Sequence, residues 1–166
     1  MIEVDIHAER PGDEPAIRAL TEAAFADMPF SDGDEHGLVD ALRAADHLTV
    51  SLVATQDDAL VGHIAFSPVT ISDGSQDWFG LGPVSVTPAL QRQGIGSALI
   101  ERGLAALQKG RARGIVLLGS PIYYARFGFE HDPRLVYPGP PAEYFQRLVL
   151  AGEPPSGIVT YAPAFA

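Results

Sequence analysis

Hydrophobic and polar residues alternate along much of the first half of the chain. From residue 48 to residue 54 every second position is apolar, which is the period of side chains on one face of a β-strand. This run extends to residue 56, and two more strand-like runs follow at 60–71 and 78–86 after turn-forming residues, chiefly Asp, Gly and Ser. We therefore expect three strands in an antiparallel meander, with a shorter strand at 2–6 ahead of them.

Other segments carry apolar residues three and four positions apart, the spacing of one helix face. This spacing predicts helices over 14–27, 35–45 and 95–109, and Asp13 is placed to cap the first of them. A serine followed by a proline, residues 120–121, predicts the start of a shorter helix over 122–127.

The second half of the chain predicts a parallel pair of strands. The helix over 95–109 lies between the third strand of the meander and an apolar run at 115–118, an order that gives a right-handed parallel crossover. Beyond it we expect strands at 129–131 and 157–161, and the segment 143–150 fits either a helix or a strand. The pattern as a whole predicts an α/β fold in one domain spanning the chain, with a mixed, mostly antiparallel sheet flanked by helices.

Gly82-Pro83 interrupts the third strand of the meander. Proline has no N–H to donate to a neighbouring strand, so it belongs at a sheet edge or a bulge. A bulge bends its strand. We therefore expect this strand to turn away from its neighbour and to open a gap in the sheet.

Residues 91–97, Gln-Arg-Gln-Gly-Ile-Gly-Ser, stand where the predicted helix over 95–109 begins. The first turn of a helix has N–H groups without an intrahelical partner, and the helix dipole adds positive charge there. Glycine at 94 and 96 lets an anion approach this backbone closely. The segment lacks the lysine of a nucleotide P-loop, and Leu99 stands where a dinucleotide-binding fingerprint needs its third glycine. It therefore predicts a cradle for some other phosphate-bearing ligand.

The stretch GPVSVTPALQRQGIGSALIERGL resembles the acetyl-CoA-binding segment of GNAT-type N-acetyltransferases. Val86-Thr87-Pro88 matches the strand exit of that family, and Gln91, Gly94 and Gly96 match its loop. A second segment, 123–129, resembles the family's Tyr-x-x-x-Gly-Phe motif. The resemblance covers residues 2–131 and implies a sheet whose central parallel strands splay apart around the pantetheine arm, with acetyl-CoA as co-substrate.

The resemblance also implies roles for individual residues. It places main-chain groups of one strand along the pantetheine and those of the following loop on the pyrophosphate; these cofactor-binding candidates are Val84, Ser85, Val86, Gln91, Arg92, Gln93, Gly94, Ile95, Gly96 and Ser97. Tyr124, four residues before Gly128, matches the tyrosine that protonates the leaving thiolate, and Tyr123 would exchange roles with it if the helix were rotated by one residue. Arg126 and the loop 111–113 are candidates for the 3′-phosphate.

A general base is harder to find. The family's carboxylate has no match, because residues 81–86 contain no acid. The candidates are His63, Glu35, His36 and Asp77, and a water relay or the absence of a dedicated base is the alternative.

Composition narrows the function classes. The net charge of −10, from 21 acidic and 11 basic residues, disfavours nucleic acid as a partner. No cysteine is present, which excludes an acyl-cysteine intermediate, and no His/Asp/Glu cluster has metal-ligand spacing. No signal peptide or membrane span is evident, so we expect a cytoplasmic protein.

We therefore expect an N-acetyltransferase that moves the acetyl group of acetyl-CoA to a primary amine by direct attack. The alternative is a non-catalytic acyl-CoA sensor or regulatory module. The acceptor is a small-molecule or peptide amine, its pocket is expected around 25–35 and the C-terminal strands, and the protein is a monomer or a homodimer.

Overall fold

The computed structural model describes residues 3–26 and 35–166. The helices are α1 (Glu14–Phe25), α2 (Glu35–Ala44), α3 (Ile95–Lys109) and α4 (Pro121–Tyr124). The strands are β1 (Asp5–Ala8), β2 (Val50–Gln56), β3 (Ala59–Pro68), β4 (Thr70–Ile71), β5 (Trp78–Val86), β6 (Gly114–Leu118), β7 (Leu135–Val136), β8 (Phe145–Val149) and β9 (Gly157–Thr160). Short 3₁₀ turns lie at Pro88–Leu90, Ala125–Phe127, Ala142–Tyr144 and Pro163–Phe165.

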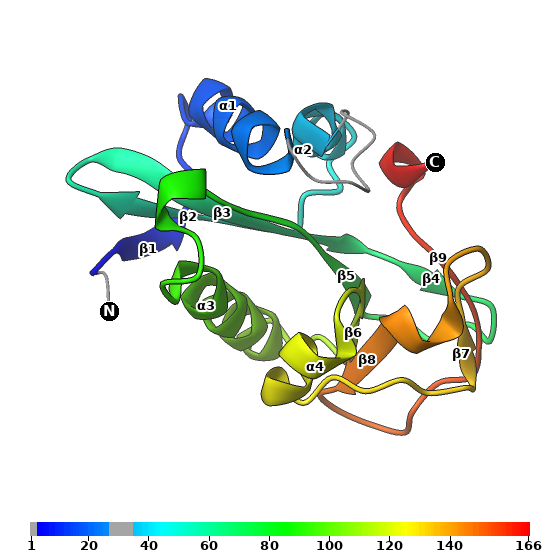
Figure 1. The fold of residues 1–166 in the computed structure, drawn as a ribbon. Helices are drawn as coiled ribbons and strands as arrows, with labels where there is room; N and C mark the ends of the chain where they lie inside the picture. The colour runs from blue at the N-terminus through cyan, green and yellow to red at the C-terminus, as the bar shows by residue number, and fades with distance from the viewer. Residues whose placement is uncertain (1–2, 27–34) are drawn as a thin grey trace.

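Within these residues the main sheet has the strand order β1-β2-β3-β5-β6-β8. Every neighbouring pair is antiparallel except β5 and β6, which run parallel. In the chain these two strands precede and follow α3. Helices α1 and α2 cover one face of the sheet, and α3 and α4 cover the other (Figure 1). The mixed sheet, the meander and the parallel crossover are all confirmed.

The helices form where one face can be buried. In α3 the buried residues recur at helical spacing: Ile95, Leu99, Ile100, Gly103 and Leu107. They pack on apolar residues of β3 and β6 in the largest core cluster. The position of Asp13 before α1 is as predicted, but its carboxylate accepts a hydrogen bond from the Arg10 N–H at 2.7 Å and makes no cap to the helix.

The C-terminal part differs most from expectation. The predicted strand at 129–131 is reduced to a single bridge between Glu130 and Arg147, and the ambiguous segment 143–150 forms β8. Strand β9 joins β4 and β7 in a separate small sheet. The run at 60–71 divides at Val69 into β3 and β4, because its last two residues pair with β9.

Candidate functional site

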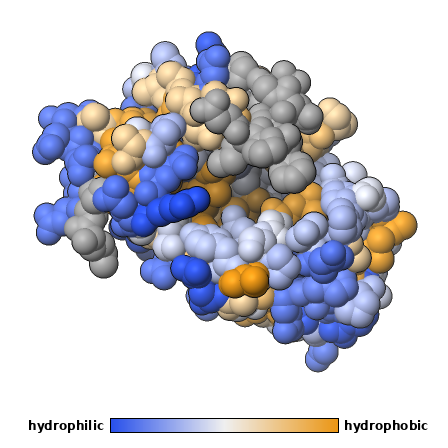
Figure 2. Space-filling view, viewed as in Figure 1, coloured by the Kyte–Doolittle hydropathy of each residue, from blue (hydrophilic) through white to orange (hydrophobic). Residues whose placement is uncertain are grey.

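Strands β5 and β6 separate along the middle of the main sheet. Their paired positions are Trp78–Gly114, Phe79–Ile115 and Gly80–Val116. Beyond Gly80, β5 continues to Val86 along β3, whereas β6 runs to Leu118 without a β5 partner. Figure 2 shows a hollow with apolar residues on its floor near the centre of the same view. The two strands therefore form the sides of a gap in the sheet.

The predicted bulge lies where β5 leaves β6. The register shifts so that Gly82 and Pro83 together lie opposite the single residue Ala65 of β3. Two residues against one bend the bulged strand. The bulge predicted from proline chemistry is thus confirmed, and it lies at the point where the gap opens.

Main-chain groups at the end of β5 face this gap. The Thr87 N–H donates to the Val61 carbonyl of β3 at 2.9 Å. Along an antiparallel strand, residues whose main-chain groups bond the neighbouring strand alternate with residues whose main-chain groups point away from it. The main chain of Ser85 therefore faces β3, while those of Val84 and Val86 face the gap. The Val86 carbonyl accepts a hydrogen bond from the Gln91 side chain at 3.1 Å, which ties the following loop to the strand.

The loop between β5 and α3 turns through left-handed backbone at two residues. Arg92 has φ 65° and Gly94, the N-cap of α3, has φ 92°, a conformation that favours glycine. The N–H groups of residues 92–97 donate no backbone hydrogen bond to another described residue, and the first bond of the helix is from Ala98 to Gly94 at 3.0 Å. These donors and the helix dipole make this a site suited to an anion.

Gly96 has no packing reason to be glycine. A Cβ built on it would come no closer than 3.9 Å to another atom, the Tyr123 hydroxyl or a Val86 methyl group. Glycine is also a poorer helix former than alanine. It borders a cavity of about 430 Å³, lined by Val86, Gln91, Arg92, Gly94, Gly96, Ser97, Tyr123 and Arg126. The missing side chain therefore leaves room in a cavity rather than relieving a contact within the protein.

Tyr123 and Arg126 form the far wall of this cavity. The Tyr123 hydroxyl lies 3.0 Å from Ser97 Oγ, so it is tied to the first turn of α3. The Arg126 guanidinium stacks over the Tyr123 ring, 4.4 Å from its centroid, and donates to the Tyr123 carbonyl at 2.9 Å. With Arg92 it gives the cavity two cationic side chains, which suits a phosphate-bearing ligand.

Tyr124 lies against the end of β6. Its ring packs so closely on Gly119 that a Cβ there would lie 2.4 Å from it, and it meets Phe129 edge-on, with 6.1 Å between ring centroids. Burial raises the pKa of Tyr124 to about 12. Its hydroxyl makes no hydrogen bond to a described residue, so this phenol is a neutral donor without a partner at neutral pH.

His63 is fully buried on the other face of the sheet. Its neighbour Gly62 faces Ile95 and Leu99 of α3, so the imidazole points to the side covered by α1 and α2. Its Nε2 lies 2.7 Å from Ser51 Oγ. Burial lowers the pKa of His63 to about 4, an effect that the Glu9 carboxylate opposes. The imidazole is therefore neutral at pH 7 and does not line the cavity at α3.

The remaining candidates lie elsewhere. Asp77 is exposed at the opposite end of β5 from Val86. The loop 111–113 follows the last turn of α3, roughly 20 Å from its first turn at 1.5 Å per residue. The side chains of Glu35 and His36 and the residues 27–34 lie outside the described part of the chain, and with them most of the expected acceptor pocket.

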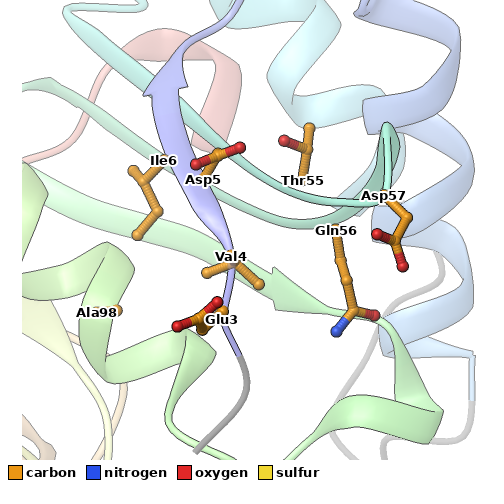
Figure 3. A pocket seen from close by; sticks show the side chains of 8 residues that line it. All are labelled: Glu3, Val4, Asp5, Ile6, Thr55, Gln56, Asp57 and Ala98. Atoms are coloured by element: carbon orange, nitrogen blue, oxygen red, sulfur yellow. The ribbon is translucent and has the colours of Figure 1, made fainter.

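Another hollow, of about 550 Å³, lies beside the edge strand β1. Three carboxylates line it, those of Glu3, Asp5 and Asp57, and Figure 3 shows them spread around the hollow rather than converging. A wall of carboxylates repels phosphate groups. The smaller cavity at α3 is therefore the better phosphate site.

Sequence reasoning missed an ion-pair network behind His63. The Ser51 hydroxyl donates to the Glu9 carboxylate, which pairs with Arg43 of α2 at 2.9 Å. Arg43 also pairs with Asp40 at 3.0 Å. These partners are up to 42 residues apart, and no spacing rule in the sequence links them.

In the ranges 3–26 and 35–166 no group of three His, Cys, Asp or Glu side chains has metal-binding geometry. Within the same ranges no helix is long and apolar enough to cross a membrane.

Comparison with known proteins decides the family. Residues 47–131 match the model of the acetyltransferase (GNAT) domain. The chain is also 37% identical over 158 residues to the Escherichia coli protein named uncharacterized N-acetyltransferase YhbS, an alignment covering 92% of this chain and 91% of that protein. The chain belongs to the GNAT acetyltransferase family.

Two solved structures share the whole architecture of this GNAT protein. A GNAT acetyltransferase from Brucella melitensis, crystallised with acetyl-CoA, is 49% identical, with a TM-score of 0.88 and 99% of both chains covered. YhbS from Escherichia coli, crystallised with CoA, is 34% identical, with a TM-score of 0.89, and the match covers 99% of this chain and 93% of that one. The GNAT fold inferred from the two sequence motifs is therefore confirmed.

Proposed function

We propose that this protein transfers the acetyl group of acetyl-CoA to a primary amine. The observation that carries the proposal is the start of α3. There, N–H groups without a described partner and Gly96, whose side-chain position is open, border a cavity that Val86 at the end of β5 also lines. Acetyl-CoA has a pyrophosphate that can accept hydrogen bonds from the N–H groups at the start of α3. It also has a pantetheine arm whose amide groups can pair with the main chain at the end of β5. Two similar GNAT structures contain acetyl-CoA or CoA, which supports this choice of ligand.

The site residues have distinct roles in this proposal. The N–H groups of residues 92–97 hold the pyrophosphate, and Val84 and Val86 hydrogen-bond the pantetheine through their main chains. One N–H of this strand end also polarises the thioester carbonyl, because a donor aimed at a developing oxyanion stabilises the transition state. Gln91 acts indirectly, by holding the loop against Val86.

The reaction is a direct attack. The amine nitrogen bonds to the thioester carbon, a tetrahedral intermediate forms, and the carbon–sulfur bond then breaks. We assign protonation of the departing thiolate to Tyr124 and not Tyr123, because the Tyr123 hydroxyl already bonds Ser97 whereas that of Tyr124 has no described partner. With a pKa of about 12, Tyr124 is protonated at neutral pH and therefore carries the proton that the departing thiolate needs.

The test begins with acetyl-CoA binding, measured by calorimetry for the wild type and for Gly96→Glu. The new carboxylate would enter the cavity, so we expect the wild type to bind in the micromolar range and the variant to lose binding while its circular dichroism is unchanged. Equal binding by the two proteins would refute the site.

A screen of primary amines follows, with release of the CoA thiol as the readout and Tyr124→Phe as the control. Turnover that falls in Tyr124→Phe supports the enzyme. Tight binding of acetyl-CoA without turnover of any amine would instead favour the alternative, a non-catalytic acyl-CoA sensor.

A further inference from the structure

A row of buried polar side chains crosses three strands on the sheet face covered by α1 and α2. His63 of β3 and Ser85 of β5 are directly opposite each other in the antiparallel register, and they are 0% and 2% exposed. Neither His63 Nδ1 nor Ser85 Oγ has a hydrogen-bond partner. Leaving a buried polar atom unpaired costs about 1–3 kcal/mol, so two such atoms on a pair of cross-strand neighbours need an explanation.

The hydrogen bonds behind His63 fix where its proton lies. Partial burial acts to raise the pKa of Glu9, but hydrogen bonds from Arg43 and Ser51 bring it below the usual value, so Glu9 is an ionised carboxylate that can only accept. Ser51 must therefore donate its single proton to Glu9, and its oxygen accepts from His63 Nε2–H. His63 Nδ1 is left as a bare acceptor, on the residue that pairs with Ser85 in the strand register.

We propose that this row relays the proton of the attacking amine to solvent. Its members, in order, are Ser85, His63, Ser51 and Glu9. As the amine attacks, its N–H bond breaks and the proton passes to Ser85 Oγ, while each member gives its own proton to the next. This step requires the Ser85 side chain to turn so that its Oγ meets the amine and donates to His63 Nδ1, two atoms that make no hydrogen bond to each other in this structure. The proton arriving at Glu9, whose side chain is 18% exposed, leaves to water. The relay rests on the proposed acetyl transfer, in which His63 is a positioning residue because it acts through Ser85.

Ser85 is placed for this task. It stands between Val84 and Val86, the two residues whose main chains face the gap, and β5 itself has no ionisable side chain. An ammonium substrate must lose a proton before or during attack. A hydroxyl that donates to a neutral imidazole would supply an acceptor at this strand without placing a charge beside the thioester.

Burial keeps the imidazole neutral, although the Glu9 charge acts to raise its pKa. Charged and titratable side chains also lie around the row. They are His7 and Glu9 at β1, Arg18 on α1, and Asp40 and Arg43 on α2. Arg43 pairs with both Glu9 and Asp40, so its charge is compensated and the ion pairs form the outer end of the relay.

The first test uses the full chain labelled with ¹⁵N-histidine, and its signals for His63 are identified with His63→Gln. Long-range ¹H–¹⁵N spectra should show a neutral ring protonated at Nε2 from pH 5 to pH 8. Adding acetyl-CoA should shift the Nδ1 signal in the wild type but not in Ser85→Ala. Ser67→Ala is the matched control. Like Ser85, Ser67 is a buried serine whose hydroxyl has no hydrogen-bond partner, but it lies on β3 and outside the row. The Nδ1 signal of this variant should respond to acetyl-CoA as that of the wild type does.

The second test is kinetic and uses an amine found by the screen. Ser85→Ala and Ser51→Ala should each lower kcat on the order of 100-fold with the KM for acetyl-CoA unchanged, and should move the pH–rate profile to higher pH. Ser67→Ala should leave both unchanged.

A His63 ring protonated at Nδ1, or no response of Nδ1 to acetyl-CoA, would overturn the relay. So would a wild-type kcat in both Ser85→Ala and Ser51→Ala. Calorimetry on the same samples separates this failure from that of the proposed function: a wild type that does not bind acetyl-CoA refutes the function, whereas intact binding with the wrong tautomer refutes the relay alone.

Discussion

Replacing Gly96 by alanine should make the protein more stable and a poorer binder of acetyl-CoA. The added methyl group has its nearest neighbours at 3.9 Å, which is ordinary van der Waals contact, so the fold accepts it without strain. Alanine then gains about 0.5–1 kcal/mol from helix propensity and from a less flexible unfolded chain. For a chain of this length that corresponds to a rise in Tm of about 1–4 °C.

Binding should change in the opposite direction. The same methyl group projects into the cavity that the proposed function assigns to the pyrophosphate. We expect the Kd for acetyl-CoA to rise at least about 10-fold, equivalent to about 1.4 kcal/mol. Thermal unfolding without ligand and calorimetry with acetyl-CoA measure the two effects separately.

Gly103 of the same helix provides the control. A Cβ there would lie 2.3 Å from the Phe66 ring in the core, and such overpacking costs about 1–3 kcal/mol. Gly103→Ala should therefore lower Tm, yet bind acetyl-CoA normally while it is folded, because it is seven residues from Gly96. If Gly96→Ala binds acetyl-CoA as the wild type does, or unfolds at a lower temperature, the reasoning about the cavity is wrong.

Three further predictions concern other parts of the structure. Gln91→Ala removes the bond to Val86, so urea unfolding should show a loss of about 1 kcal/mol and calorimetry a weaker affinity for acetyl-CoA. Tyr124→Phe should lower kcat on the order of 100-fold with acetyl-CoA affinity retained, and the wild-type pH–rate profile should show no loss from tyrosine ionisation below about pH 11, since the Tyr124 pKa is about 12. Buried Asp132 accepts hydrogen bonds from Arg134 and Arg147, which hold its pKa far below the usual value. Asp132→Asn should therefore cost about 2 kcal/mol of unfolding free energy at pH 7, and this difference should shrink as pH falls below about 4.

Elements whose signals are local could be predicted from the sequence. Strand β5 spans the predicted residues 78–86, because its apolar run is bounded by turn residues on both sides. The start of α3 and the bulge at Gly82-Pro83 were predictable for the same reason: glycine and proline restrict the chain wherever they stand. The positions of the anion cradle at Gly96 and of the tyrosines of α4 could therefore be predicted as well.

Features that depend on distant partners could not be predicted in this way. Asp13 sits at the N-cap position, yet its carboxylate bonds Arg10, and only the path of the preceding turn decides between these donors. Strand β9 pairs with β4, about 90 residues earlier in the chain, and its alternating pattern fits either sheet. The network behind His63 joins Glu9 to Arg43 across 34 residues. In the sequence, each of these charged residues looks like an ordinary surface residue.

The separation of β5 from β6 leaves two strand edges inside the protein instead of at its periphery. An exposed edge at the periphery of a sheet invites pairing with other chains and aggregation, whereas these edges lie within the sheet, where helices cover both faces (Figure 1). A guest that pairs with them completes the sheet, so part of its binding energy becomes folding energy. Amide hydrogen exchange at Val84 and Val86 should therefore slow when acetyl-CoA is present.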